Sequence, residues 1–247
     1  VFTNQALAIG DNNLTIAVPS GAVPAQTFAR FRYTTATVMT PSFVGLQTTG
    51  EVEDYQVNIL NTQFLVSSPT VAEGNASTTS LTFVISRTNN ANAASVDYAI
   101  TGGTASSGTD YVALASGTAN FTAGGDLTQN VTVTVNGDLM VEDNETVILT
   151  LSNPVGGGIS GATGTGSITN DDAATLTLSG GTAKNEGAAG TTSYTFTATL
   201  NNPVEGGFGS PYTTTNGTAT VADNDFVDND GSLSFAGTSG EQKTITV

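Results

Sequence analysis

Apolar and small polar residues alternate along most of this chain, and this period of two constrains its fold more than any other feature. Residues 131–135 read Val-Thr-Val-Thr-Val, and residues 81–85 and 147–151 are similar runs rich in Thr, Val, Ile and Leu. Such residues suit the pleated, half-buried surface of a strand. Turn clusters separate the runs, and no stretch of ten residues has the period of a helix. Many short strands with regular turns predict an all-β fold of antiparallel sandwiches.

The chain also repeats itself. Glu73 with its following Gly recurs as Glu186, and Asp110 with its following aromatic residue recurs as Asp225, at offsets of 113 to 115 residues. Landmarks that keep one offset indicate duplicated modules. We therefore expect three units: residues 1–61, which do not join the repeat, a complete module over 62–172, and a partial second copy over 173–247.

The second copy stops at Val247, opposite Val133 of the first, and lacks counterparts of residues 138–172. A sandwich without those strands leaves unpaired backbone groups and an open core. We expect either that the chain continues or that another chain supplies the strands, and favour continuation because the first copy encodes these pieces next in line. The start at Val1 without a signal-peptide pattern likewise leads us to expect a piece of a longer protein.

Composition excludes several classes of function. The chain has no Cys and no His, which rules out a disulfide, a thiolate nucleophile, a Ser-His-Asp triad and a zinc site with nitrogen or sulfur ligands. Five basic residues against 21 acidic ones give a net charge of −16, which argues against nucleic-acid binding and anionic membrane surfaces. No apolar run approaches the roughly 20 residues of a membrane-spanning helix. A glycosidase pair of carboxylates is disfavoured because Trp is absent, so we expect no enzyme.

The acidic residues follow the repeat. Residues 62–172 carry a net charge of −9, and Glu73, Asp110, Glu142 and Asp172 each lie at the end of a predicted strand. Loops of a sandwich cluster at its two ends, so these carboxylates are expected to converge. Like charges ~4 Å apart repel by several kcal/mol at an effective dielectric constant near 20, and a fold that gathers them without Lys or Arg needs a cation. A hard ion with six to eight oxygen ligands, Ca²⁺, fits best.

Four motifs over residues 62–172 resemble a complete Calx-β domain. They are Val-Ala-Glu-Gly at 71–74, Gly-Thr-Ala with Gly-Thr-Asp-Tyr at 103–111, Val-Glu-Asp-Asn-Glu-Thr at 141–146 and Ser-Ile-Thr-Asn-Asp-Asp at 167–172. Residues 173–247 resemble the first two-thirds of a second copy. Residues 28–61 resemble the end of a GEVED domain through Phe-Ala-Arg-Phe-Arg at 28–32 and Gly-Glu-Val-Glu-Asp-Tyr at 50–55.

The resemblance implies tandem Ig-like sandwiches with calcium in the loops at one end. The ligands that it implies, including two in the second module, are Glu73, Asp110, Asp138, Glu142, Asp143, Asp171, Asp172, Glu186 and Asp225. Asp143 and Glu145 match less well, and Glu145 has the alternative of accepting hydrogen bonds within its loop. Because the pair at 171–172 ends one module and almost touches the next in sequence, we also expect it to act at the junction between them.

Two further acidic stretches have open interpretations. Residues 223–230 contain four Asp and resemble a D-x-D loop, for which both a local calcium site and a solvated turn are considered. An EF-hand is excluded there because the distal Glu and flanking helices are missing. In the first unit Glu51, Glu53 and Asp54 accompany Arg30 and Arg32, for which we weigh ion pairing across neighbouring strands against a second metal site.

The resemblance further implies a long, multidomain secreted or cell-surface protein of the bacterial type. We expect a calcium-binding structural or adhesive role, with other modules of the same chain as partners and surface glycans or proteins as open candidates. One alternative is a subunit of an extracellular filament in which chains exchange strands and so self-assemble. Another is a binding module appended to a secreted enzyme, which an exposed aromatic platform would favour.

Overall fold

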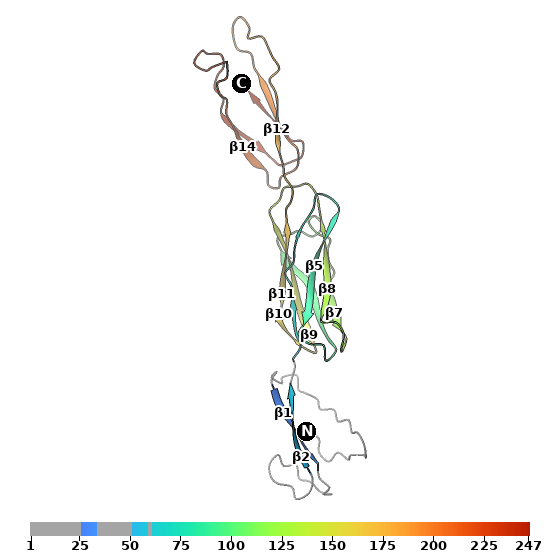
Figure 1. Cartoon of the computed structure of the whole chain (residues 1–247). Helices are drawn as coiled ribbons and strands as arrows, with labels where there is room; N and C mark the ends of the chain where they lie inside the picture. The colour runs from blue at the N-terminus through green and yellow to red at the C-terminus, as the bar shows by residue number, and fades with distance from the viewer. Residues whose placement is uncertain (1–25, 34–50, 59–60) are drawn as a thin grey trace.

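The computed structural model describes residues 26–33, 51–58 and 61–247, and every regular element in these ranges is a strand. Figure 1 shows a central sandwich of β3–β11 between a hairpin-like pair, β1 and β2, and the strands β12–β16. No helix in the described ranges has the length and apolar character that crossing a membrane requires. The predicted all-β fold is thus confirmed.

Strands β1 (Gln26–Tyr33) and β2 (Glu51–Asn58) form an antiparallel pair in the first unit. Arg30 faces Asp54 across the pair and donates two hydrogen bonds of 2.7 Å to its carboxylate, from Nε and Nη2. The expected ion pair between neighbouring strands is confirmed for these two residues. Both side chains are exposed, so solvent screens the pair and it contributes little to stability. The side chains of Arg32 and Glu51, like residues 1–25, 34–50 and 59–60, lie outside what the structure describes.

Two facing sheets form the central sandwich, in the orders β10-β3-β5-β8 and β4-β11-β9-β6-β7. Their strands are β3 (Gln63–Val66), β4 (Thr70–Ala72), β5 (Thr78–Arg87), β6 (Ala94–Gly103), β7 (Gly117–Phe121), β8 (Thr128–Asn136), β9 (Glu145–Val155), β10 (Gly158–Gly161) and β11 (Thr163–Thr169). The alternating apolar residues face inward as predicted: Leu81, Phe83 and Ile85 of β5 are buried. They pack with the inward residues of β8 and β9 in one continuous core.

The sandwich is antiparallel except at one edge of each sheet. There β10 pairs in parallel with β3, and β11 pairs in parallel with β4. The cause is a change of sheet by the first part of the chain, since β3 hydrogen-bonds in one sheet and β4 in the other. The three residues between these strands include Pro69, which cannot donate to a ladder and suits such a crossing.

Arg87 is buried at the end of β5 although it is the only basic residue of the central module. Its guanidinium donates to the backbone carbonyls of Asn92, Thr122, Gly125 and Asp126 at 2.7–3.3 Å. It also lies over the ring of Phe121, 5.0 Å from the centroid. The side chain therefore ties two turns at this end of the sandwich to the core.

We predict that Arg87→Met lowers the free energy of unfolding by about 3 kcal/mol or more, because buried carbonyls lose their donors. Chemical denaturation measures the change. Lys243→Met is the matched control, since Lys243 is partly exposed and pairs only with Glu241, and it should cost less than about 1 kcal/mol. Equal losses in the two variants would contradict the structural role of Arg87.

The second module repeats the first in space. Its strands are β12 (Leu176–Gly180), β13 (Thr195–Leu200), β14 (Phe208–Tyr212), β15 (Gly231–Phe235) and β16 (Gln242–Thr246), in sheets ordered β12-β13-β16 and β14-β15. These correspond to β3, β5, β6, β7 and β8. One contact illustrates the correspondence: a Cβ at Gly117 would meet the hydroxyl of Tyr98 at 2.6 Å, and a Cβ at Gly231 would meet that of Tyr212 at 2.7 Å.

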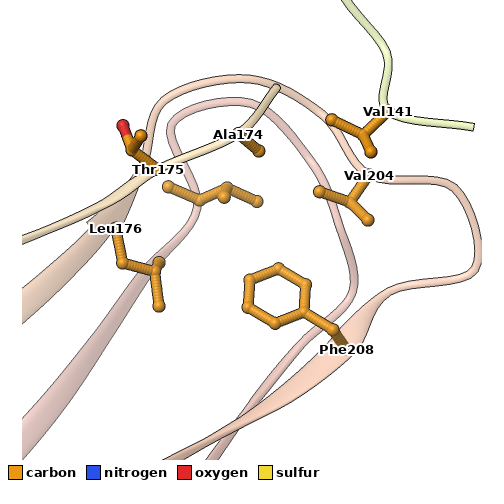
Figure 2. A pocket seen from close by; sticks show the side chains of 7 residues that line it. Val141, Ala174, Thr175, Leu176, Val204 and Phe208 are labelled. Atoms are coloured by element: carbon orange, nitrogen blue, oxygen red, sulfur yellow. The ribbon is translucent and has the colours of Figure 1, made fainter. Parts of the chain in front are cut away.

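The core of the second module is small and open at one end. Ala198, Leu200 and Phe235 are its buried cluster. A hollow beside it is lined by residues from both modules, since Val141 of the central sandwich joins Val204 and Phe208 there (Figure 2). Within residues 61–247, β14 pairs with β15 alone, whereas its counterpart β6 pairs with both β7 and β9. The described part of this module therefore has no strand in the place of β9.

Two equivalent glycines test this difference. Gly103 has a φ of +127°, and a Cβ there would lie 2.0 Å from the carbonyl oxygen of Thr146 at the start of β9. Gly217, at the same place in the repeat, has no atom within 4 Å of such a Cβ. We predict that Gly103→Ala lowers the free energy of unfolding by about 3 kcal/mol and that Gly217→Ala changes it by less than about 0.5 kcal/mol. Denaturation of the whole chain measures both, and comparable losses would show that a strand packs against Gly217 as β9 packs against Gly103, which would refute the difference between the modules.

Candidate metal centre

Acidic side chains gather at the end of the central sandwich that adjoins the second module. Four strands, β4, β6, β8 and β11, end there, and the segment after each one carries a carboxylate. The topology brings these ends together because β4 runs parallel to β11, while β6 and β11 both run antiparallel to β9. Residues almost 100 positions apart in the sequence thereby become neighbours.

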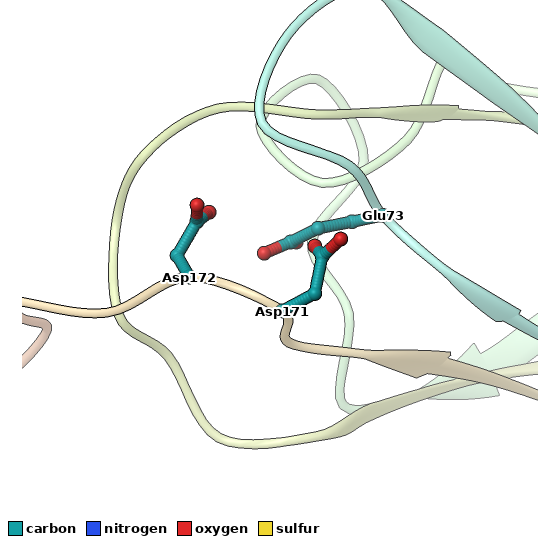
Figure 3. A group of neighbouring side chains, drawn as sticks. All are labelled: Glu73, Asp171 and Asp172. Carbon is teal, nitrogen blue, oxygen red and sulfur yellow. The ribbon is translucent and has the colours of Figure 1, made fainter.

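The first group consists of Glu73, Asp171 and Asp172, which point toward one another in Figure 3. One carboxylate oxygen from each lies within 4.8 Å of the others. Glu73 is only 4% exposed and Asp172 only 8%. The backbone fixes the group, since Gly74 N donates to Asp171 Oδ1 at 3.0 Å and the Asn75 side chain donates to Asp172 Oδ1 at 2.5 Å.

Two oxygens of this group have no hydrogen-bond partner. They are Glu73 Oε1 and Asp172 Oδ2, both fully buried. An unpaired buried carboxylate oxygen is costly, and native structures rarely leave one without a partner. The other acids of this group have no proton to donate when they are ionised. A cation bound between them would satisfy both oxygens at once.

The second group consists of Asp110, Glu142 and Glu145, again with one oxygen each within 4.8 Å of the others, and all three are half-buried. Ser106 N donates to Asp110 Oδ2 at 2.5 Å. Glu142 N donates to Asn170 Oδ1 at 3.2 Å, which links the loop before β9 to the segment after β11. That link places the two groups side by side, and we call them together the acidic basin.

Electrostatics join the two groups. Burial, followed by the charges of Glu142, Asp138, Asp172 and Asp171, raises the pKa of Glu73 to about 7. Burial also raises the pKa of Glu142, with the next largest effects from Asp110 and Asp138. Each acid therefore makes ionisation of its neighbours less favourable. The burial and the mutual repulsion of these acids therefore favour the protonated form of Glu73 in the folded chain.

Glu145 shows the same effect. Its pKa is raised to about 7, first by burial and then by Asp110 and Glu142. The sequence indicates Glu145 less strongly as a ligand, with hydrogen bonding within its loop as the alternative. The alternation of β9 could have identified Glu145. Side chains two residues apart lie on the same face of a strand, so Glu145 is on the same face as the buried Val147 and Leu149.

The structure places most of the predicted ligands in or beside the basin. Glu73, Asp110, Glu142, Asp171 and Asp172 belong to its two groups. Asp138 belongs to neither, but its charge acts on both Glu73 and Glu142, and its own carboxylate accepts a hydrogen bond from Met140 N at 2.6 Å. Asp143 is exposed and joins no group of acids in the described ranges. Glu205, from the second module, lies near the basin and had no signal in the sequence.

The second module retains the local structure of two ligand positions. Thr192 donates to the carbonyl of Glu186 at 2.9 Å as Thr79 does to that of Glu73, and Thr220 N donates to Asp225 Oδ2 at 2.9 Å. Glu186 is exposed, however, and within residues 61–247 neither acid joins a group of three. The partner loops that complete the basin in the first module have no counterpart among these residues. Metal binding at Glu186 and Asp225 stays a prediction.

The acidic stretch of the second module is held by threonines. Thr220 donates to Asp223 and Asp225, and Thr214 donates to Asp228 and Asp230, at 2.6–2.9 Å. These bonds fit the interpretation of the stretch as a hydrogen-bonded, solvated turn. A calcium site at this turn remains untested.

The fold and the basin define a chain of β-sandwich modules with a cluster of carboxylates at a module end. The family model "Calx-beta domain" matches residues 60–178 and 169–247, so this chain belongs to the Calx-beta domain family. The model "GEVED domain" matches residues 1–58. Both resemblances found in the sequence are thereby confirmed.

This chain is similar to several solved structures. A crystal structure of the apo-form Calx CBD1 domain is 27% identical, has a TM-score of 0.41, and covers 46% of this chain and 100% of its own. CBD12 from CALX1.2 is 25% identical with a TM-score of 0.40 over 74% of each chain. The calcium binding domain CBD12 of CALX1.1 is 23% identical with a TM-score of 0.40, over 75% of this chain and 74% of its own. No curated protein matches the chain.

The raised pKa values predict how the metal-free protein responds to pH. Below about pH 4.5 both the folded and the unfolded states keep Glu73 and Glu145 protonated. Between about 4.5 and about 7 the unfolded chain releases these protons and the folded chain retains them, so the free energy of unfolding falls as the pH rises. Above about pH 7 these two residues are ionised in both states, and their effect on the free energy of unfolding no longer changes with pH.

Melting in EDTA at pH 5 and pH 8 measures this effect, and we expect the lower melting temperature at pH 8. Glu73→Gln, which cannot ionise, should reduce the difference between the two conditions. A melting temperature that climbs from pH 5 to pH 8 in EDTA would show that the basin is not strained by its charges.

Proposed function

We propose that this chain binds Ca²⁺ in the acidic basin and serves as a structural segment of a longer extracellular protein. The observation that carries the proposal is the pair of buried, unpartnered oxygens, Glu73 Oε1 and Asp172 Oδ2, among further carboxylates. Membership of the Calx-beta family supports it, because the resemblance itself implies calcium in these loops.

The donor set favours calcium over other ions. The basin offers only oxygen ligands, since the sequence has neither His nor Cys, and transition metals prefer nitrogen or sulfur. Ca²⁺ takes six to eight oxygens, whereas Mg²⁺ keeps several waters and needs fewer carboxylates. The residues that would hold calcium are Glu73, Asp110, Asp138, Glu142, Glu145, Asp171 and Asp172. When bound, the ion would supply positive charge that the described residues of the basin lack.

The extracellular and adhesive part of the proposal rests on the module arrangement. The chain combines a GEVED match with two Calx-beta matches, carries a net charge of −16, and has its candidate site at a module end. Such a site suits a protein that must keep a string of modules extended where calcium is plentiful. Its proposed partners are neighbouring modules of the same long chain, together with glycans or proteins of a surface, and its proposed location is outside the cell.

Calorimetry of the whole 1–247 chain tests calcium binding. Calcium at ~100 times its dissociation constant should raise the free energy of unfolding by about 2.7 kcal/mol relative to EDTA. At pH 8, Glu73→Gln should raise the melting temperature in EDTA, because it removes a buried charge, and should lose most of the gain from calcium. This reversal of sign separates a ligand from a residue that merely supports the fold.

The exposed Asp126, in the turn between β7 and β8 at the far end of the sandwich, supplies the control. Asp126→Asn removes the same charge and should leave the gain from calcium intact. Identical melting temperatures of the native chain in EDTA and in millimolar Ca²⁺ would refute the proposed function.

A further inference from the structure

The two modules are joined by backbone hydrogen bonds beside the acidic basin. Val141 N donates to the carbonyl of Pro203 at 3.0 Å, and Glu205 N donates to the carbonyl of Val141 at 2.9 Å. Val141 and Val204 thus form a parallel bridge between the loop that follows β8 and the loop that follows β13. Two hydrogen bonds on one residue fix both the distance and the direction of the neighbouring segment.

Apolar packing reinforces this contact. The side chain of Val141 lies beside Val204 and faces the same hollow as Phe208, Ala174 and Leu176 at the end of the second core (Figure 2). The backbone of Val141 therefore belongs to a loop of the first module, while its side chain packs against the core of the second. Its next residue is Glu142, and the residue after Val204 is Glu205.

Glu205 thereby brings a carboxylate from the second module to the rim of the basin. Because the bridge is parallel, Glu205 follows Val204 in the same direction in which Glu142 follows Val141. Among the residues that the structure describes, the ion pairs are Arg30–Asp54 and Lys243–Glu241, so no Lys or Arg offsets Glu205. A bridge that presses an uncompensated acid toward other acids stores repulsion unless a cation lies between them.

We propose that Glu205 is a ligand, supplied by the second module, for a cation held by Asp110, Glu142 and Glu145, so that the two modules share one ion. The proposal rests on the proposed function, because it needs the basin to bind calcium. The orphaned oxygens of Glu73 and Asp172 lie in the adjoining group of the same basin and independently indicate a cation there. The role is specific to this chain's junction, in which the bridge at Val141 sets the position of Glu205.

A shared ion has a mechanical consequence. In the metal-free chain the bridge at Val141 holds the modules together against the repulsion of Glu205 by Glu142 and Glu145. With the ion in place, Glu205, Glu142 and Glu145 are each attracted to it, and the range of angles between the two modules narrows. Calcium should then act on the second module even though its own ligand positions, Glu186 and Asp225, form no group of three in the described ranges.

The test compares the whole native chain with Glu205→Gln and Asp126→Asn, with Ca²⁺ alone as the probe. Titration calorimetry measures affinity. Because the chain has no cysteine, Thr132→Cys in β8 and Thr244→Cys in β16 add two spin labels at exposed positions, and electron resonance measures the distribution of distances between the modules. We expect calcium to narrow that distribution in the native chain and in Asp126→Asn.

In Glu205→Gln we expect affinity for at least one ion to fall by about tenfold and the distribution to stay broad with calcium. Two results would overturn the proposal while leaving calcium binding intact. One is equal affinity and equal narrowing in all three chains, and the other is an equal loss in Glu205→Gln and Asp126→Asn, which would reduce the effect to net charge. Absence of any binding by the native chain would instead overturn the proposed function itself.

Discussion

Repulsion between carboxylates is the constraint on which the rest of this structure depends. The strand order of the central sandwich forces the ends of β4, β6, β8 and β11 together, and each end brings an acid with it. Burial of Glu73 and Asp172 removes the water that would otherwise solvate them, and no donor replaces it at Glu73 Oε1 or Asp172 Oδ2. Burying these acids therefore offsets part of the free energy that the core gains.

The junction extends the same constraint to the neighbouring module. The second core is small in the described residues, and part of what closes it is Val141, a residue of the first module's acidic loop. One loop therefore serves two purposes, because its apolar residue packs against the next module while Glu142 beside it faces the basin.

Much of this fold could be predicted from the sequence, since period-two alternation sets which face of each strand is buried. The inward residues of β5 and β8 and the offset between the modules follow from that pattern. Most of the acids in the basin were also predictable, because acids at strand ends of a sandwich converge. Asp143 was not separable from its neighbours by spacing alone, and it points to solvent. Glu205 and the buried Arg87 were missed because both depend on contacts between segments that no local pattern encodes.

The parallel pairs at the sheet edges bear on how the module carries a load. Its chain enters through β3 and β4 and leaves through β11, and β4 and β11 are hydrogen-bonded side by side in the same direction. Tension applied along a string of such modules pulls these two strands past each other, across hydrogen bonds that lie perpendicular to the force. All bonds of the pair must then yield together, whereas the strands of a hairpin pulled at its open end separate one bond at a time. Because the chain crosses from one sheet to the other between β3 and β4, each sheet has a parallel edge pair that resists sliding of its strands.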